Sequence, residues 1–225
     1  MAIFANRNFK NSIIMKKFFV ILSAALLLLA GTNAFAQMSS GLGYVNSTTV
    51  LKLSKNGDGS TSNVNGLYAG FGYTIPLVEG LNVTPGVYYE LLYEQDADEL
   101  WGMTASGTRI EHYINVPVTF SYGLSPMSGV RVFVFAGPTA SYGLASTTRG
   151  GMSIGNISLG GKTDNYEDGD YGRFDLMIGG GAGVQLGGFR LTAGYDLGLL
   201  NRYTGTVDGI SRQTRRFYIG IGRLF

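Results

Sequence analysis

The most informative feature of this sequence is a period-two alternation of apolar residues with polar or small ones. Between Phe174 and Leu186, apolar side chains alternate with Asp175, Gln185 and several glycines. Alternation of this kind is typical of β-strands with one apolar face. It recurs along the chain and predicts eight strands, at residues 42–53, 65–75, 83–93, 111–122, 130–143, 173–186, 189–199 and 217–225.

The predicted strands are long, and the connections between them alternate in length. Many run to about ten residues or more, whereas soluble strands usually have about five or six and a tilted membrane strand needs about 9–11. Long connections at 52–64, 95–107, 144–170 and 200–212 alternate with short ones at 76–81, 123–129 and 187–188. We therefore predict an all-β fold, an eight-stranded antiparallel up-and-down transmembrane β-barrel with periplasmic termini and turns.

Ionisable residues within the predicted strands fall on the face opposite the aliphatic one. In a membrane barrel the apolar face meets lipid and the polar face fills the lumen. The predicted lumen charge network consists of Glu90, Glu111, Arg173, Asp175, Arg190, Asp196 and Arg216. A soluble lipocalin-like barrel or β-sandwich is the alternative, and it would place the aliphatic stripes inside and the charges outside.

The N-terminal region has the parts of an export signal. Lys16 and Lys17 precede an apolar run at 18–30, and Ala34-Phe35-Ala36 is a small-x-small cleavage site. The run is too short for a comfortable membrane-spanning helix, which disfavours a retained anchor. We expect cleavage after Ala36, so that residues 1–36 are an N-terminal extension plus signal peptide and residues 37–225 are the barrel domain. Translation could start at Met1 or at Met15.

Charge and cysteine content exclude several classes of protein. The whole chain has 17 basic and 15 acidic residues, but residues 1–36 hold four of the basic ones and no acidic one. The remaining chain is therefore slightly acidic, which argues against nucleic-acid binding. The absence of cysteine excludes disulfides, thiolate metal sites and cysteine nucleophiles.

The single histidine is the natural candidate for catalysis. Outer-membrane enzymes that use a histidine pair it with serine or aspartate. His112 has the parity of the apolar stripe, and no serine or aspartate is tied to it by spacing. We therefore predict no catalytic residues, and a lipid-modifying enzyme is the least favoured function.

Three further motifs suggest ligands only weakly. The acidic segment 164–170 with Asp175 faintly resembles a calcium loop, but Tyr166 stands where an oxygen ligand is needed. The glycines of 179–183 lie within a predicted strand with no helix after them, which excludes a phosphate loop. We predict no metal and no cofactor. The basic cluster Arg202, Arg212, Arg215 and Arg216 could bind anionic lipopolysaccharide head groups, or could lie at the interface with one lumen ion pair from Arg216.

Several motifs carry a resemblance to bacterial outer-membrane barrels. Phe217, Ile219, Ile221 and the terminal Phe225 resemble their C-terminal assembly signal, although Arg223 departs from it. The segments 110–118, 135–138 and 181–184, followed by 195–199, resemble strands of the porin-family barrel proteins of Bacteroidetes. The resemblance covers residues 37–225 and implies the fold, a cell outer membrane location and a partner in the barrel assembly machinery.

The expected function follows from a narrow, filled barrel. Eight strands leave room only for the barrel's own side chains. We expect a structural or surface-interaction protein that contacts outer-membrane lipid, lipopolysaccharide and an unknown surface or periplasmic protein, with Trp101 and Tyr166 as surface contacts. A narrow pore for small solutes is the alternative.

Overall fold

The computed structural model describes residues 37–53, 59–100, 103–154, 157–167, 171–207 and 209–225, all within one compact unit. The predicted signal peptide and its cleavage site lie outside the described residues. The strands are β1 (Gln37–Leu53), β2 (Gly59–Val78), β3 (Leu81–Leu100), β4 (Met103–Met127), β5 (Val130–Ile154), β6 (Ile157–Asp164), β7 (Phe174–Leu186), β8 (Phe189–Gly198) and β9 (Ile210–Leu224). No helix in these ranges is long and apolar enough to cross a membrane.

Eight of these strands close into an antiparallel barrel. The sheet order is β4-β3-β2-β1-β9-β8-β7-β5-β6, and β4 also pairs with β5, which closes the ring without β6. Three connections are tight turns containing Gly80, Gly129 and Gly187, each with positive φ. Glycine adopts this conformation without the steric cost of a side chain. These turns lie at the same end as the start of β1 and the end of β9, hereafter the turn end; the opposite end is the loop end.

The two faces of the barrel wall differ as the alternation predicts. Leu191 and Ile219 are 52% and 50% exposed, whereas Asp175 and Asp196 are 0% and 3% exposed. The aliphatic side chains therefore point out of the cylinder and the charges point into it. The predicted eight-stranded transmembrane barrel is confirmed, and the soluble alternative with the aliphatic stripes inside is excluded.

Three of the predicted long loops are largely strand, and here the prediction was wrong. In predicted loop 52–64, the β1–β2 ladder continues to Lys52 and Gly59. The β3–β4 ladder continues to Leu100 and Met103, through most of predicted loop 95–107. The β4–β5 ladder continues to Met103 and Ile154, and β6 then pairs back along β5. Once ladders have started, the Thr-, Ser- and Gly-rich segments continue them because each added pair satisfies more backbone groups.

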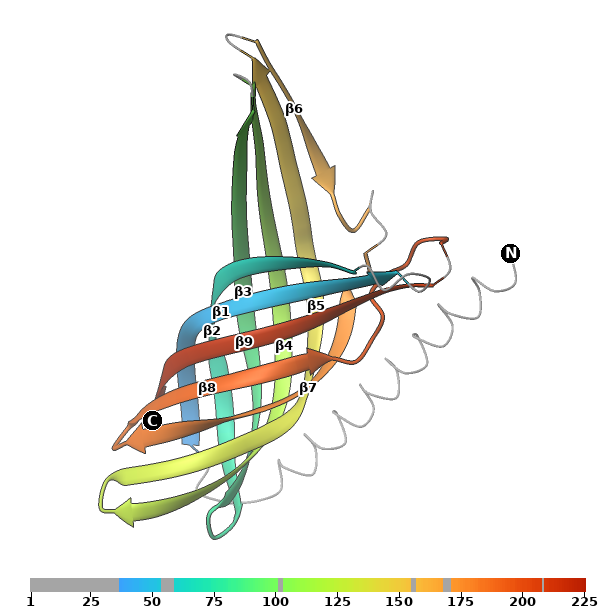
Figure 1. The fold of residues 1–225 in the computed structure, drawn as a ribbon. Coiled ribbons are helices and arrows are strands. Elements are labelled where there is room, and N and C mark those ends of the chain that lie inside the picture. Colours follow the sequence, from blue (N-terminus) through green and yellow to red (C-terminus); the bar gives the residue numbers. More distant parts are fainter. Residues whose placement is uncertain (1–36, 54–58, 101–102, 155–156, 168–170, 208) are drawn as a thin grey trace. The chain divides into compact units, whose positions relative to one another are not determined.

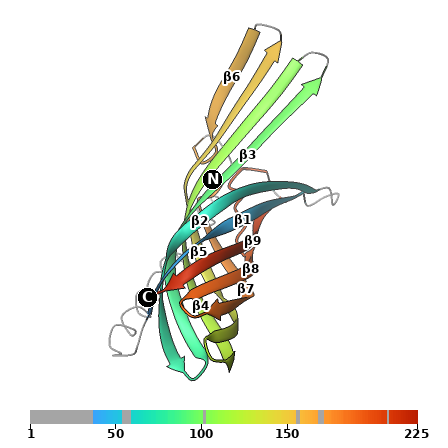
Figure 2. The same cartoon turned by 90° about the vertical axis from the view of Figure 1, so that its left-hand side faces the viewer.

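Together these segments form a projecting sheet, which we define as residues 94–100, 103–110, 147–154 and 157–164. The β2–β3 ladder ends at Asn65 and Tyr93, and the β5–β7 ladder ends at Tyr142 and Phe174. Beyond those residues β3, β4, β5 and β6 pair only with one another. Figures 1 and 2 show them continuing past the other strands of the barrel.

Candidate functional site in the barrel interior

An ion network crosses the middle of the lumen. Arg216 on β9 donates from Nη1 to Glu90 Oε2 on β3 at 2.8 Å and pairs through Nη2 with Asp196 on β8. Asn115 Nδ2 donates to the same Glu90 oxygen at 2.9 Å. All three charged side chains are less than 10% exposed. Charges this deep in a protein need a partner to offset their desolvation, and the network supplies one for each.

An apolar layer lies next to the network on its loop-end side. Val45, Val64, Leu92 and Tyr113 pack together, each 4% exposed or less. Leu92 lies two residues beyond Glu90 and Tyr113 two before Asn115, so they share the inward face. This layer has no polar group that could coordinate water across the lumen except the Tyr113 hydroxyl, which donates to Glu111 at 3.0 Å.

A third layer of arginine and tyrosine fills the loop end of the lumen. The Arg202 guanidinium lies 4.1 Å from the centre of the Tyr171 ring and 5.4 Å from that of Tyr113. Tyr166 stacks on Tyr171 with ring centres 5.6 Å apart. Arg202 is only 2% exposed, and cation–π contacts of this kind gain strength when water is excluded.

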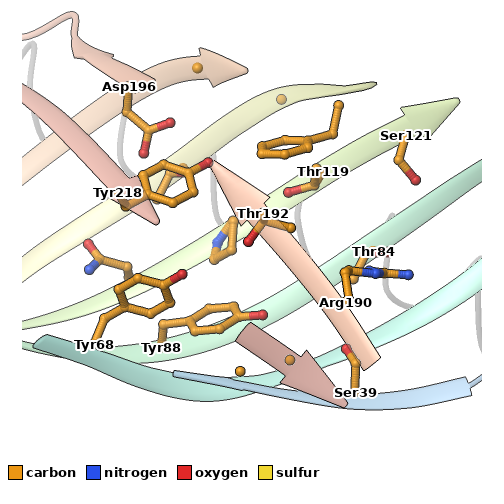
Figure 3. Close-up of a pocket in the computed structure, with 18 of the residues that line it drawn as sticks. Ser39, Tyr68, Thr84, Tyr88, Thr119, Ser121, Arg190, Thr192, Asp196 and Tyr218 are labelled. Atoms are coloured by element: carbon orange, nitrogen blue, oxygen red, sulfur yellow. The ribbon is translucent and has the colours of Figure 1, made fainter. Parts of the chain in front are cut away.

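A cavity of about 160 Å³ occupies the turn-end half of the lumen. The ion network forms its inner end, and Ser39 and Ser121 line it near the turns. Tyr68, Tyr88 and Tyr218 form one side, with Tyr68 edge-on to both other rings at 5.9 and 6.1 Å between ring centres. Figure 3 shows their hydroxyls directed towards the part of the cavity that holds Thr192 and Arg190.

Strand glycines create the space for these rings. A β-carbon at Gly220 would lie 2.1 Å from the Tyr68 hydroxyl, and one at Gly194 would lie 2.5 Å from that of Tyr218. Both distances are shorter than the closest approach of a Cβ atom to another heavy atom. Glycine on the inward face of β8 and β9 therefore allows each tyrosine to lie flat across a neighbouring strand, as in other barrels where aromatic rings cover glycine.

The predicted lumen charges occupy several places rather than one network. Glu111 pairs with Arg109 at 2.6 Å and accepts from Ser146 Oγ at 2.9 Å. Asp175 is fully buried, and its Oδ2 has no hydrogen bond within the described chain. Arg173 donates to the Leu144 carbonyl at 2.8 Å and lies over the Tyr166 ring.

Arg190, like Arg173 and Asp175, forms no ion pair within the described residues. It lies over the Phe133 ring at 5.0 Å. In the described part of the chain its Nε makes no hydrogen bond and it forms no ion pair. Its guanidinium is therefore unpaired beside the cavity.

Sequence reasoning missed the aromatic residues and one arginine of the interior. Tyr68, Tyr88 and Tyr218 have the parity of the glycines and charges, and that parity was the signal that could have placed them inside. Arg202 carried no such signal, because it belongs to a connection outside the alternating segments. Its burial depends on contacts with Tyr171 and Thr214, which are distant in sequence.

The expected basic surface of four arginines is wrong. Arg202 and Arg216 point into the lumen, and Arg212 lies over the Tyr171 ring at 4.8 Å. Only Arg215 of the four is exposed. The strand alternation of β9 separates neighbouring arginines onto opposite faces, so no four-residue basic surface exists.

The expectation that Tyr166 is a surface contact is also wrong. It is a half-buried part of the loop-end layer rather than a surface contact. Burial raises the pKa of its hydroxyl to about 12. Trp101, the other expected surface contact, lies outside the described residues.

The remaining motifs are placed as follows. His112 lies on the outer face, where its Nδ1 contacts the Tyr89 hydroxyl. The glycines of 179–183 are in β7. In the described ranges no group of three or more acidic or histidine side chains could hold a metal, and Asp168 to Asp170 of the calcium-like segment fall outside those ranges. Phe217, Ile219, Ile221 and Phe225 point outward, each at least 43% exposed.

A closed antiparallel barrel with an aliphatic exterior and an ionic interior defines an integral β-barrel membrane protein. A family model, "Outer membrane protein beta-barrel domain", matches residues 31–203. The chain therefore belongs to this family of outer-membrane β-barrels.

Several solved structures are similar to this chain at low sequence identity. The attachment invasion locus protein Ail of Yersinia pestis has 12% identity and a TM-score of 0.39, with 84% of this chain and 99% of that chain covered. Neisserial surface protein A has 14% identity and a TM-score of 0.37, with 83% and 97% covered. The N-terminal barrel domain of Pseudomonas aeruginosa OprF has 14% identity and a TM-score of 0.30, with 84% and 99% covered. No curated protein matches the sequence.

Proposed function

We propose that this outer-membrane barrel is a non-conducting protein that binds a partner through its projecting sheet. The observation that carries the proposal is the contrast between its two halves. The lumen is filled by three successive layers of side chains, whereas the projecting sheet holds polar groups clear of the barrel wall.

The filled lumen supports the non-conducting part. The Arg216 ion network and the Val45–Leu92–Tyr113 layer fill two successive levels of the lumen. An ion that passed would have to break buried ion pairs and then cross an apolar layer, each at a large desolvation cost. The narrow-pore alternative is therefore disfavoured.

The projecting sheet supports the interaction part. Beyond Tyr93, β3 pairs only with β4, and β6 pairs only with β5, so both margins carry backbone groups without a strand neighbour in the described chain. Edges of this kind can accept an added strand from a partner. Asp96, Ser106, Arg149 and Lys162 are exposed on it, so recognition would combine backbone pairing with polar side chains.

The orientation and export of the chain belong to the same proposal. The apolar run at 18–30 and the Ala34-Phe35-Ala36 site support cleavage after Ala36. Termini and tight turns would then lie in the periplasm and the projecting sheet outside the cell, in contact with lipopolysaccharide. The outward-facing Phe217, Ile219, Ile221 and Phe225 would be read by the barrel assembly machinery, and the motifs at 110–118 and 195–199 favour a Bacteroidetes-type member of the family.

A lipid-modifying activity remains the least favoured function. Such chemistry needs a base hydrogen-bonded to a nucleophile and oriented by a third group. The imidazole of His112 contacts Tyr89 on the lipid-facing wall. An unchanged lipid profile in cells that express His112→Ala is the expected result, and loss of a modified lipid would contradict it.

Two measurements test the proposal separately. Planar-bilayer recording of the folded barrel should give no steady open channels, and steady conductance would overturn the non-conducting part. Surface-expressed protein should capture a partner that is lost when residues 149–162 are replaced by a two-residue turn. Capture that survives both this replacement and the replacement of the β3–β4 counterpart at residues 96–106 would overturn the interaction part.

A further inference from the structure

We propose that the turn-end cavity is a binding site for a monosaccharide-sized anion, a sugar acid with one carboxylate. The site is separate from the projecting sheet and does not depend on the function proposed above. The ligand would enter from the turn end, because the ion network of Arg216 closes the other side.

The size of the cavity limits the ligand to about one ring. A cavity of about 150 Å³ in another protein accommodates a benzene molecule, and the volume here is about 160 Å³. Drug-sized pockets begin at about 300 Å³. A single six-membered ring therefore fits inside the cavity. A monosaccharide acid has about twice as many non-hydrogen atoms as benzene, so its substituents would extend into the opening at the turn end, and a disaccharide does not fit.

The charge of the ligand is set by Arg190. Its guanidinium lines the cavity and has no ion pair in the described chain, while its Nε lacks a hydrogen bond. A carboxylate can accept two parallel hydrogen bonds from one guanidinium, which makes an arginine with an unpaired fork a specific anion receptor.

The remaining lining favours a hydroxylated ring over an apolar one. Thr84, Thr119 and Thr192 line the cavity and are labelled in Figure 3. Thr84 and Thr119 face each other across β3 and β4, and Thr192 lies two residues from Arg190 on the same face of β8. The Tyr88 and Tyr218 rings supply the flat apolar surfaces on which the C–H face of a sugar can pack. The carboxylates of Glu90 and Asp196 at the inner end accept hydrogen bonds from ligand hydroxyls and repel a second anionic group, so the acid group is expected at the Arg190 end.

Titration calorimetry of the folded barrel in detergent micelles, with glucuronate as the probe, tests the site. We expect saturable binding, with glucose at least about tenfold weaker because it lacks the charge that pairs with the guanidinium. Arg190→Gln should weaken glucuronate binding at least about tenfold, and Arg190→Lys should retain part of it. Arg215→Gln removes the same charge from the outer face of β9 and is the matched control, with unchanged binding.

Heat-modifiable gel migration establishes that each variant is folded. If Arg190→Gln does not fold, Tyr88→Phe and Thr192→Val replace it, each expected to weaken binding several-fold. The proposal is overturned if glucuronate gives no saturable heat at millimolar concentration, or if Arg190→Gln and Arg215→Gln bind it equally. Equal binding of acetate and glucuronate would overturn the sugar-acid assignment.

Discussion

Single residues in this barrel are constrained by how its narrow lumen is filled. Arg216, two carboxylates and an amide form one network in the lumen. Elsewhere, glycines allow tyrosine rings to lie against the wall. Large and small residues therefore depend on each other across neighbouring strands. Substitutions on the inward face should have effects that differ sharply with position.

Removing the central cation should be among the most destabilising substitutions. Arg216→Met leaves Glu90 and Asp196 buried without a counter-charge, a situation that typically costs about 3–5 kcal/mol. The free energy of unfolding in lipid vesicles, followed by circular dichroism against denaturant, should fall by about that amount. Arg109→Met is the comparison, because Arg109 is 21% exposed and Glu111 keeps hydrogen bonds from Tyr113 and Ser146. An equal fall in the free energy of unfolding for the two variants would show that the Arg216 network stabilises the barrel no more than the Arg109–Glu111 pair does.

The glycine that accommodates Tyr68 should not tolerate a methyl group. In Gly220→Ala the new β-carbon would lie 2.1 Å from the Tyr68 hydroxyl and 2.7 Å from the Leu42 carbonyl oxygen. Overpacking of this kind costs about 1–3 kcal/mol. In the same unfolding assay Gly161→Ala, which meets no atom within 4 Å, should be nearly silent. A silent Gly220→Ala would mean that the ring moves aside freely.

Because of the loop-end layer, the free energy of unfolding of the barrel should decrease in strong alkali. Burial raises the pKa of Tyr166 to about 12, above the value of about 10 for an unfolded tyrosine. A group whose folded pKa is raised contributes fully below the unfolded pKa and loses that contribution as pH rises through the folded pKa. Stability should therefore drop between about pH 10 and 12, and by less in Tyr166→Phe. Identical pH profiles for the two proteins would contradict the assignment.

At the scale of elements, the wall and the projecting sheet share β3, β4 and β5 but differ in how they are held together. The wall is held by pairing around the whole ring, whereas the extension of β3, β4, β5 and β6 pairs only within itself. The ring does not require the extension to close.

Shortening the extension should therefore leave the barrel folded. In the variant with residues 149–162 replaced by a two-residue turn, the β5–β7 and β3–β4 wall ladders remain complete. Heat-modifiable migration on gels should match that of the full chain. A loss of the folded band would show that the barrel needs its extension for stability. Shortening within the wall, for example removal of residues 132–135 and 181–184, is the control that should abolish folding.

At the scale of the whole molecule, the outward aliphatic surface makes lipid the solvent of the native state. Ile219 is 50% exposed in the middle of β9. An arginine facing hydrocarbon near the bilayer midplane costs about 2–4 kcal/mol in barrels of this kind.

Ile219→Arg should accordingly impair folding into lipid vesicles by about 2–4 kcal/mol. The expected readout is a shift of the denaturant midpoint for insertion, measured by the folded band on gels. Gly161→Arg in the projecting sheet is the control and should insert normally. Improved solubility of Ile219→Arg without detergent, with the fold intact, would contradict membrane insertion.

The sequence by itself determined the wall of this protein. The period-two alternation places each side chain inside or outside because successive residues of a strand face opposite ways. It therefore predicted the strands, their closure, and the inward direction of Glu90, Asp196 and Arg216 without any knowledge of which would touch.

Only the tertiary structure decided which inward groups meet, and where the ladders end. Arg216 reaches Glu90 across 126 positions of sequence, and a local pattern contains no information on such distances. Arg202 enters the lumen from a connection because its guanidinium packs there against the rings of Tyr171 and Tyr113. The strands β3 to β6 extend beyond the wall because each pairs with a neighbouring strand. Pairing partners and lumen contacts are properties of the closed cylinder, so they exist only once all eight wall strands are in place.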